Sequence, residues 1–245
     1  MTDESPQRPR AKRDPEASPE AVGTTSNDQS LLLDAIMTTR AIRRYTDEPV
    51  TDAEIEVCLR AAVQAPNNGN IQPWQFLVIT DAETKRAVGE VYRRSYDRFE
   101  NAYNKMAPPP RNEADASHRE RMKRASRYLA DTIGEAPAMV AFLMPKIDLT
   151  MRDDDGPIFI GTTHASVFPA VQNFILAARA QGIGTAFTTV YRVHEDEVRA
   201  ILSVPEVFEV VALVPMGRPR GKFGVAPRRP AAQVTHWNRY GEKRI

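Results

Sequence analysis

The chain has 245 residues, enough for one large hydrophobic core, and its 42% hydrophobic and 27% charged residues are ordinary for a globular protein. A net charge of +1 gives no general reason to expect nucleic acid or an anionic membrane as a partner. Cys58 is the only cysteine, which excludes an internal disulfide and favours a cytoplasmic location; with only four histidines, a Cys/His zinc site is not expected. No apolar run approaches the roughly 18 residues that span a bilayer.

The first 30 residues are rich in Pro, Ser, Glu and Arg, and Val22 is their only large aliphatic side chain. Such a segment cannot bury enough apolar surface to offset the entropy of ordering it. We therefore expect residues 1–30 to be a disordered tail that precedes a single domain of residues 31–245.

Two helices are predicted at the start of this domain. Residues 31–40 have apolar side chains at helical spacing, namely Leu32, Leu33, Ile36 and Met37. A second helix is predicted over 52–65, with Thr51 or Asp52 as its cap. Cys58 lies on the apolar face of this helix, so we expect a buried structural thiol rather than a reactive one.

A strand is predicted over 75–80, followed by two charged helices over 82–106 and 117–133 that a proline-rich break over 107–115 separates. We interpret the excursion 92–133 as a helical lid at the edge of the core. Four aromatic side chains recur at helical spacing along it: Tyr92, Tyr96, Phe99 and Tyr103. Packing beneath the lid is the favoured interpretation, and a substrate wall is the alternative for one or two of them.

The rest of the chain mixes strands and helices without the regular alternation of a doubly wound sheet. The patterns predict, in chain order, a strand over 138–144, a loop over 151–159, a helix over 164–182 that ends at Gly182, a strand beginning in 183–191, a short helix over 194–202 and a strand over 208–217. Four apolar strands with long helices between them indicate an α+β or three-layer fold around a central sheet. Residues 218–245 are rich in Gly, Pro and Arg and are expected to form an extended arm. Because such arms often pack on a second subunit, we expect a homodimer.

Four groups of polar residues are candidates for chemistry. Residues 39–45 contain three arginines, whose forks suit a phosphate or a negative charge on a ring, although a solvated charge run has the same pattern. Residues 65–74, APNNGNIQPW, crowd amides that can bond a heterocycle edge, although Asn and Gly also favour an ordinary loop. The other two groups are the Thr cluster at Thr185, Thr188 and Thr189, and the pair Arg228 and Arg229.

Several common motifs are absent from the sequence. It contains no G-x-x-x-x-G-K-S/T, no G-x-G-x-x-G after a strand, no G-x-S-x-G and no H-E-x-x-H. No nucleophile–base pair stands out either. This pattern suits an enzyme whose bound cofactor carries the chemistry.

Residues 40–50, RAIRRYTDEPV, and 65–74 resemble the first two conserved blocks of the nitroreductase family of FMN-dependent oxidoreductases, most closely its actinobacterial branch. Residues 172–189 and 226–230 resemble the third and fourth blocks, in the same order. The resemblance covers about residues 31–240. It implies an α+β three-layer sandwich with a mostly antiparallel central sheet, and a dimer that exchanges C-terminal arms and holds FMN at its interface.

The resemblance also implies which residues hold FMN. The first block would contact the phosphate and ribityl chain, and its last arginine would approach the N1/O2 edge of the ring; its positions are Thr39, Arg40, Ala41, Ile42 and Arg43. The family typically has arginine at position 39 and serine at position 41, so one charge and one hydroxyl are absent here. Arg40 or Arg228 is the hypothesised replacement.

The other blocks would complete the flavin site. The Asn-rich block would reach the FMN of the partner subunit through Pro66, Asn67, Asn68 and Asn70. The third block would lie beside N5 through Phe187, Thr188 and Thr189. The fourth would contact the phosphate through Arg228, with Arg229 as its neighbour.

The resemblance implies an FMN-dependent NAD(P)H oxidoreductase that reduces nitroaromatics or quinones by two-electron, ping-pong hydride transfer. Protons can come from water, so we assign no catalytic side chain. We also assign no metal ligand. The donor is left open between NADPH, NADH and a deazaflavin. Alternatives are enone reduction, reductive dehalogenation or flavin breakdown on the same fold, or a flavin-binding protein without turnover. Nucleic-acid binding through the Arg-rich ends is disfavoured by the near-neutral charge.

Overall fold

The computed structural model describes residues 26–147, 150–159 and 161–243. The chain divides at residue 34 into a short N-terminal unit and a unit of residues 35–245. Helix α1 (Ser26–Thr38) begins in the first unit and includes residues 26–30, which the sequence analysis placed in the disordered tail. The rest of that predicted tail, residues 1–25, lies outside the described residues. Among the described residues, no helix has both the length and the apolar composition of a membrane-spanning segment.

The centre of the larger unit is a four-stranded sheet in the order β1-β2-β6-β5, in which every neighbouring pair is antiparallel. Its strands are β1 (Gln75–Ile79), β2 (Ala138–Pro145), β6 (Phe208–Gly217) and β5 (Gly184–Thr185). Phe142 pairs with Ala212 and Leu143 pairs with Val210, so Val211 is an extra residue that makes a bulge in β6. The mostly antiparallel central sheet is thus confirmed.

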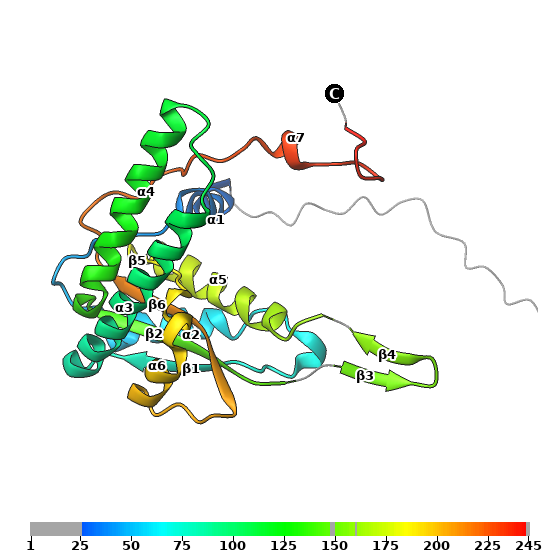
Figure 1. Ribbon diagram of the computed structural model, residues 1–245, viewed down its shortest axis with the longest axis horizontal. Coiled ribbons are helices and arrows are strands. Elements are labelled where there is room, and N and C mark those ends of the chain that lie inside the picture. Colours follow the sequence, from blue (N-terminus) through cyan, green and yellow to red (C-terminus); the bar gives the residue numbers. More distant parts are fainter. Residues whose placement is uncertain (1–25, 148–149, 160, 244–245) are drawn as a thin grey trace, which may run out of the picture. The chain divides into compact units, whose positions relative to one another are not determined.

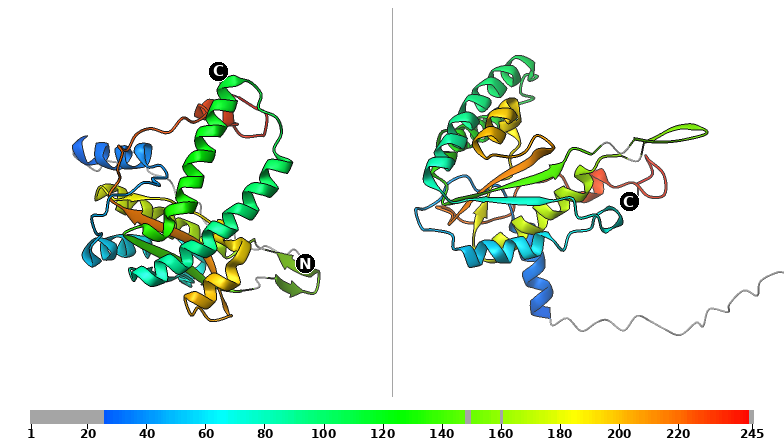
Figure 2. Two further views of the ribbon diagram at one scale, coloured as in Figure 1. Left: turned by 60° about the vertical axis from the view of Figure 1, so that its left-hand side comes forward. Right: turned by 90° about the horizontal axis from the view of Figure 1, so that it is seen from below.

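Helices cover both faces of the sheet (Figures 1 and 2). Helices α2 (Asp52–Ala62) and α5 (His164–Ala180) pack on one face, where Val140 and Phe142 belong to their apolar cluster. The opposite face is covered by α3 (Ala82–Met106), α4 (Glu113–Thr132) and α6 (Glu195–Ile201), and Met139 and Ala141 belong to that cluster. Alternate residues of β2 therefore serve two cores, which explains why this strand is apolar throughout. This arrangement confirms the α+β, three-layer expectation.

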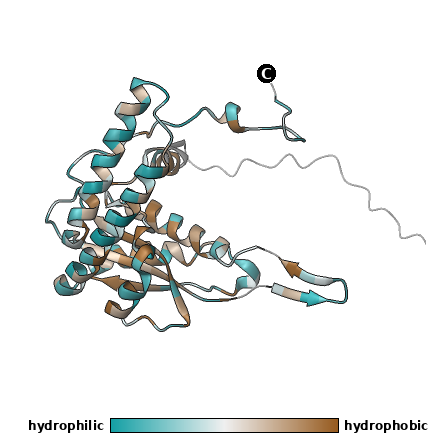
Figure 3. Cartoon of the chain, in the orientation of Figure 1, coloured by the Kyte–Doolittle hydropathy of each residue, from teal (hydrophilic) through white to brown (hydrophobic). Residues whose placement is uncertain are grey.

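The hydropathy of the helices differs between the two layers (Figure 3). Helix α5 is apolar along much of its length, whereas α3 and α4 are largely hydrophilic apart from the side that faces the second cluster. Ion pairs join α3 to α4: Arg127 of α4 bonds Asp97 at 2.6 Å and also bonds Glu100, both on α3. Arg127 also lies over the Tyr96 ring, 4.6 Å from its centroid, and apolar residues of both helices share the second cluster, so charge, a cation–π contact and apolar packing all hold the two lid helices together.

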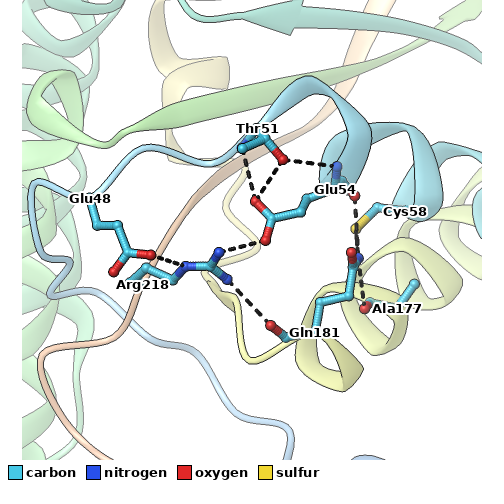
Figure 4. A network of polar contacts seen from close by, with 7 residues as sticks. All are labelled: Glu48, Thr51, Glu54, Cys58, Ala177, Gln181 and Arg218. Carbon is cyan, nitrogen blue, oxygen red and sulfur yellow. Dashed lines mark hydrogen bonds and ion pairs between the residues drawn. The ribbon is translucent and has the colours of Figure 1, made fainter.

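A polar network fixes the start of α2 (Figure 4). Thr51 is its N-cap, and Thr51 and Glu54 form a capping box. The guanidinium of Arg218, just beyond β6, donates to Glu54 and, at 3.0 Å, to Glu48. Gln181, just beyond α5, accepts from Arg218 and donates to the Cys58 sulfur at 3.3 Å. Three segments that are distant in sequence are thereby held together.

Cys58 is fully buried, as expected, and burial raises the pKa of its thiol to about 11. At neutral pH the thiol is therefore protonated. This agrees with a structural role.

Two sequence expectations need correction. The loop expected over 151–159 is a hairpin of β3 (Thr150–Asp153) and β4 (Gly156–Phe159), because Gly156 adopts a φ of +123° that lets the acidic run turn tightly. The strand beginning in 183–191 is only two residues long; the chain returns to the sheet by a single bridge from Thr188 to Leu213 before the short helix η3 (Val190–His194). In chain order, the remaining short elements are η1 (Asn68–Asn70), η2 (Ile133–Glu135) and α7 (Ala231–Val234).

Candidate functional site

A cavity of about 940 Å³ lies between α3, α4, the proline-rich segment that joins them and residues 187–190. Four of the sequence-predicted site residues line it together: Arg43, Phe187, Thr188 and Thr189. They come from two segments more than 140 residues apart, which the tertiary structure brings to one place. Its volume is at the upper end of the range typical of small-molecule sites.

Arg43 is positioned by a segment that runs beside β5. The Ile42 amide donates to the Thr185 carbonyl at 2.8 Å, and the Tyr45 hydroxyl donates to the Ile42 carbonyl at 2.6 Å. Gly184 permits this approach, because a Cβ at that position would lie 2.7 Å from Ile42. Ile42 itself is buried, so the next residue, Arg43, is directed to the cavity.

The Arg43 guanidinium is half-buried and forms no hydrogen bond or ion pair with any other residue that the structure describes. An arginine in such a place has five N–H donors available to a ligand. This is the feature of the cavity that most directly indicates an acceptor-rich or anionic ligand.

Thr188 and Tyr92 form a buried polar pair at the base of the cavity. The two hydroxyl oxygens are 2.8 Å apart, and the Thr188 backbone exchanges two 3.0 Å hydrogen bonds with Leu213 of the sheet. Burial raises the pKa of Tyr92, an effect that the Thr188 hydrogen bond and the charge of Arg43 partly oppose. Burial likewise raises the pKa of Tyr45, so both phenols stay neutral and keep their protons at physiological pH.

The aromatic residues of α3 form one wall of the cavity. Tyr92 and Tyr96 are buried, as the packing interpretation predicted, but Phe99 and Tyr103 are 43% and 54% exposed. All four line the cavity. The ring centroids are 6.2 Å apart for Tyr96–Phe99 and 5.9 Å apart for Phe99–Tyr103, so these three rings are in contact. Together with Tyr92, they form an aromatic column along α3.

Other predicted site residues lie outside this cavity. The hydroxyl of Thr39, just beyond α1, donates to the Ala35 carbonyl of that helix, and Arg40 and Ala41 are exposed. Exposed Arg228 donates to the carbonyl of Pro227, and Arg229 is also exposed.

The Asn-rich loop also lies apart from the cavity and is held mainly by its own side chains. Asn67 accepts from the Gln72 amide at 2.9 Å, and Asn70 accepts from the Gln72 side chain at 3.2 Å. The Asn68 amide donates to Ser166 at 3.3 Å, which places the loop at the start of α5. Pro66 and Asn68 carry exposed side chains, so part of this loop is available to a partner.

The sequence did not identify the α4 side of the cavity. His118, Met122 and Ser126 line it at four-residue intervals, a helical stripe that the surrounding charges obscure. Arg119 lines it too, but its guanidinium is engaged by Asp115 at 2.9 Å and by the Pro108 carbonyl at 2.6 Å.

Comparison with known proteins agrees with the fold. A nitrobenzene nitroreductase from Ectopseudomonas oleovorans is 28% identical over 196 residues, which cover 75% of this chain and 85% of that protein. An NADH dehydrogenase from Thermus thermophilus is 25% identical over 215 residues, which cover 83% and 94%. A crystal structure of iodotyrosine deiodinase bound to FMN and 3-iodo-L-tyrosine matches with a TM-score of 0.67 at 22% identity, over 85% of this chain and all of that one. The model of the nitroreductase family matches residues 36–218, and the chain belongs to that family.

Proposed function

We propose that the protein is an FMN-dependent NAD(P)H oxidoreductase that reduces small electron-poor acceptors such as nitroaromatics and quinones. The observation that carries this proposal is the unpaired guanidinium of Arg43 beside the Thr188 hydroxyl in a cavity with an aromatic wall. Family membership and relatives named nitrobenzene nitroreductase and NADH dehydrogenase support it.

The residues at the base of the cavity fit a flavin ring. Arg43 would lower the free energy of negative charge on the ring's N1/O2 edge, and Thr188 or Thr189 would offer a hydrogen bond on the N5 side. The chemistry that FMN supplies when bound is two-electron transfer from NADPH or NADH to an acceptor, in two half-reactions. Phe187, 44% exposed, would cover part of the ring without closing the cavity. Protons can come from water, so no protein acid or base is required.

The site would be completed by a second copy of the chain. The Asn-rich loop and Arg228 lie outside the cavity, and in a homodimer with exchanged C-terminal arms they would reach the flavin of the partner subunit. Exposed apolar side chains on α1, including Ile36 at 46% and Met37 at 59%, support such a dimer. Light scattering of the purified protein measures the mass, and a monomer that retains bound FMN would contradict this arrangement.

The cavity favours turnover over a flavin carrier, because a carrier would leave no room above the ring for substrate. The test is an anaerobic titration of the FMN-loaded protein with NADPH and with NADH. Bleaching of the flavin bands and their return on adding a nitroaromatic or a quinone are the expected results. If dithionite reduces the bound flavin but neither NADPH nor NADH does, the proposal that the protein is an enzyme is refuted.

The Arg43→Ala variant tests whether the Arg43 guanidinium stabilises negative charge on the flavin ring. We expect a lower flavin midpoint potential and weaker FMN binding, because the anionic reduced ring loses its cation. Arg98→Ala is the matched control, since Arg98 is an exposed arginine of α3 that does not line the cavity and has no hydrogen bond or ion pair to another described residue. Equal potentials in all three proteins would show that Arg43 does not face the flavin.

A further inference from the structure

We propose that the lid cavity selects uncharged, planar acceptors with two or more fused or linked rings, and that Phe99 and Tyr103 determine this preference. The inference rests on the proposed function for its redox part, but the ligand class follows from the cavity alone. Three features carry it: the length of the aromatic column, its exposed outer half and the balance of charge around it.

The column is longer than one ring. Tyr92 and Tyr103 mark its ends along α3, and eleven residues of helix rise about 16 Å. Arg43 and Thr188, where the flavin ring would lie, are at the Tyr92 end. A single-ring acceptor at that end would leave the outer half of the column uncovered, whereas a multi-ring acceptor would extend along it.

The outer half of the column is available to a ligand. The ring planes of Phe99 and Tyr103 are nearly parallel, at an interplanar angle of 26°, and their centroids are 5.9 Å apart, so the two rings stack on each other with an offset. Phe99 is 43% exposed and Tyr103 is 54% exposed, and both line the cavity, so part of each ring is open to a ligand. Flat aromatic rings in that setting favour offset stacking with a planar ligand.

The charges around the cavity argue against a strongly ionic acceptor, as distinct from the flavin that Arg43 would contact. Three basic residues line it, Arg43, Arg119 and Lys123, and three acidic residues balance them, Glu100, Asp115 and Glu120. Arg119 is paired with Asp115 at 2.9 Å. Basic and acidic side chains are thus equal in number, so the wall has no excess of charge to offset the hydration that a charged ligand loses on entry, and an uncharged ligand has the advantage.

A binding experiment tests the ligand class without any redox step. Acridone, an uncharged fluorescent tricycle, is titrated into the full-length FMN-loaded protein and into its Phe99→Ala and Tyr103→Ala variants. We expect saturable binding that weakens by about five- to tenfold in each variant, because a stacking partner is lost. Phe159→Ala is the matched control: Phe159 is 77% exposed, lies in β4 and does not line the cavity, so binding should change by less than about twofold.

A kinetic experiment tests the consequence for turnover. With NAD(P)H as donor, Phe99→Ala should lower kcat/KM for 9,10-phenanthrenequinone about five- to tenfold and leave that for 1,4-benzoquinone within about twofold. Equal losses for both quinones, or no acridone binding to the wild-type protein, would overturn the inference while leaving the proposed function intact. The opposite outcome is also distinguishable: NAD(P)H does not reduce the flavin, but the protein binds acridone and Phe99→Ala weakens that binding. This result would refute the proposed function and support the inferred ligand class.

Discussion

Gly184 leaves no room for a side chain at the place where the Arg43 segment meets the sheet. A Cβ at this position would lie 2.7 Å from both Cβ and Cγ2 of Ile42 and 3.0 Å from its Cγ1. Ordinary van der Waals contact begins about 3.4 Å away, so Ile42 must move by more than half an ångström. Ile42 is buried and its amide is bonded to Thr185, so it has little freedom to do so.

The Gly184→Ala variant should therefore be destabilised by about 1–3 kcal/mol, the usual cost of overpacking a tight contact. Intrinsic preference alone predicts the opposite sign, because Ala is about 0.5–1 kcal/mol better than Gly inside a strand. Displacement of Ile42 would also move Arg43, so the proposed flavin site predicts less bound FMN per chain in this variant.

Urea unfolding measures the free energy of unfolding, and the flavin absorbance of the purified protein measures cofactor content. Gly224→Ala is the matched control, since a Cβ there would meet nothing within 4 Å. Adding Ile42→Ala to Gly184→Ala removes two of the three close atoms and should recover part of the loss, which a double-mutant cycle detects. A Gly184→Ala variant as stable as Gly224→Ala would refute the reasoning.

Three further outcomes follow from the described contacts. Tyr92→Phe leaves the buried Thr188 hydroxyl without its phenol partner and should lower the free energy of unfolding by about 1 kcal/mol, whereas in a Thr188→Val background the same change should cost much less. The hydrogen bond from the Thr51 amide, assisted by Arg218, holds the pKa of Glu54 below its ordinary value. The Glu54 carboxylate therefore stabilises the folded protein at pH values above its unfolded-state pKa. This stabilisation is lost as the pH falls through the lowered folded-state pKa. Urea unfolding from pH 7 to pH 3 should show a steeper loss for the wild-type protein than for Glu54→Gln, and identical slopes would contradict this. The Cys58 thiol, buried and with its pKa raised to about 11, should resist iodoacetamide at pH 8 until urea unfolds the chain; rapid labelling of the native protein would show that it is accessible.

Local patterns in the sequence were sufficient to predict most of the helices and strands. The capping box at Thr51 is a four-residue signal, and the structure places the start of α2 there. The hairpin over 150–159 was missed because its strands are only four residues long and their alternation is weak. The short β5 was overestimated because the chain leaves the sheet after Thr185 and touches it again only at Thr188, a path that no local pattern encodes.

For the candidate site, the sequence supplied the residues but not their arrangement. The polar composition of residues 39–45 and 185–189 indicated both groups, and the cavity brings Arg43, Phe187 and Thr188 together. The α4 side was missed because His118, Met122 and Ser126 lie in a helix whose charges dominate its pattern. The Asn-rich loop and Arg228 remain predictions, because they lie outside the cavity of the single chain.

The sequence by itself determined the family and the core on both faces of the sheet, because both depend on short-range signals. The family follows from the residues of its characteristic blocks, and the core follows from the helical and strand periodicities and from β2, which is apolar on both faces. Only the tertiary structure decided which polar residues face one ligand. Whether Arg43 points to solvent or into a cavity depends on Gly184 admitting Ile42 against the sheet, a contact between positions 142 residues apart. Likewise, the spacing of the aromatic residues along α3 does not distinguish side chains packed in the core from side chains that line a ligand cavity. The separation of α4 from Phe99 and Tyr103 exposes the outer half of that column to the cavity, and no local pattern specifies this separation.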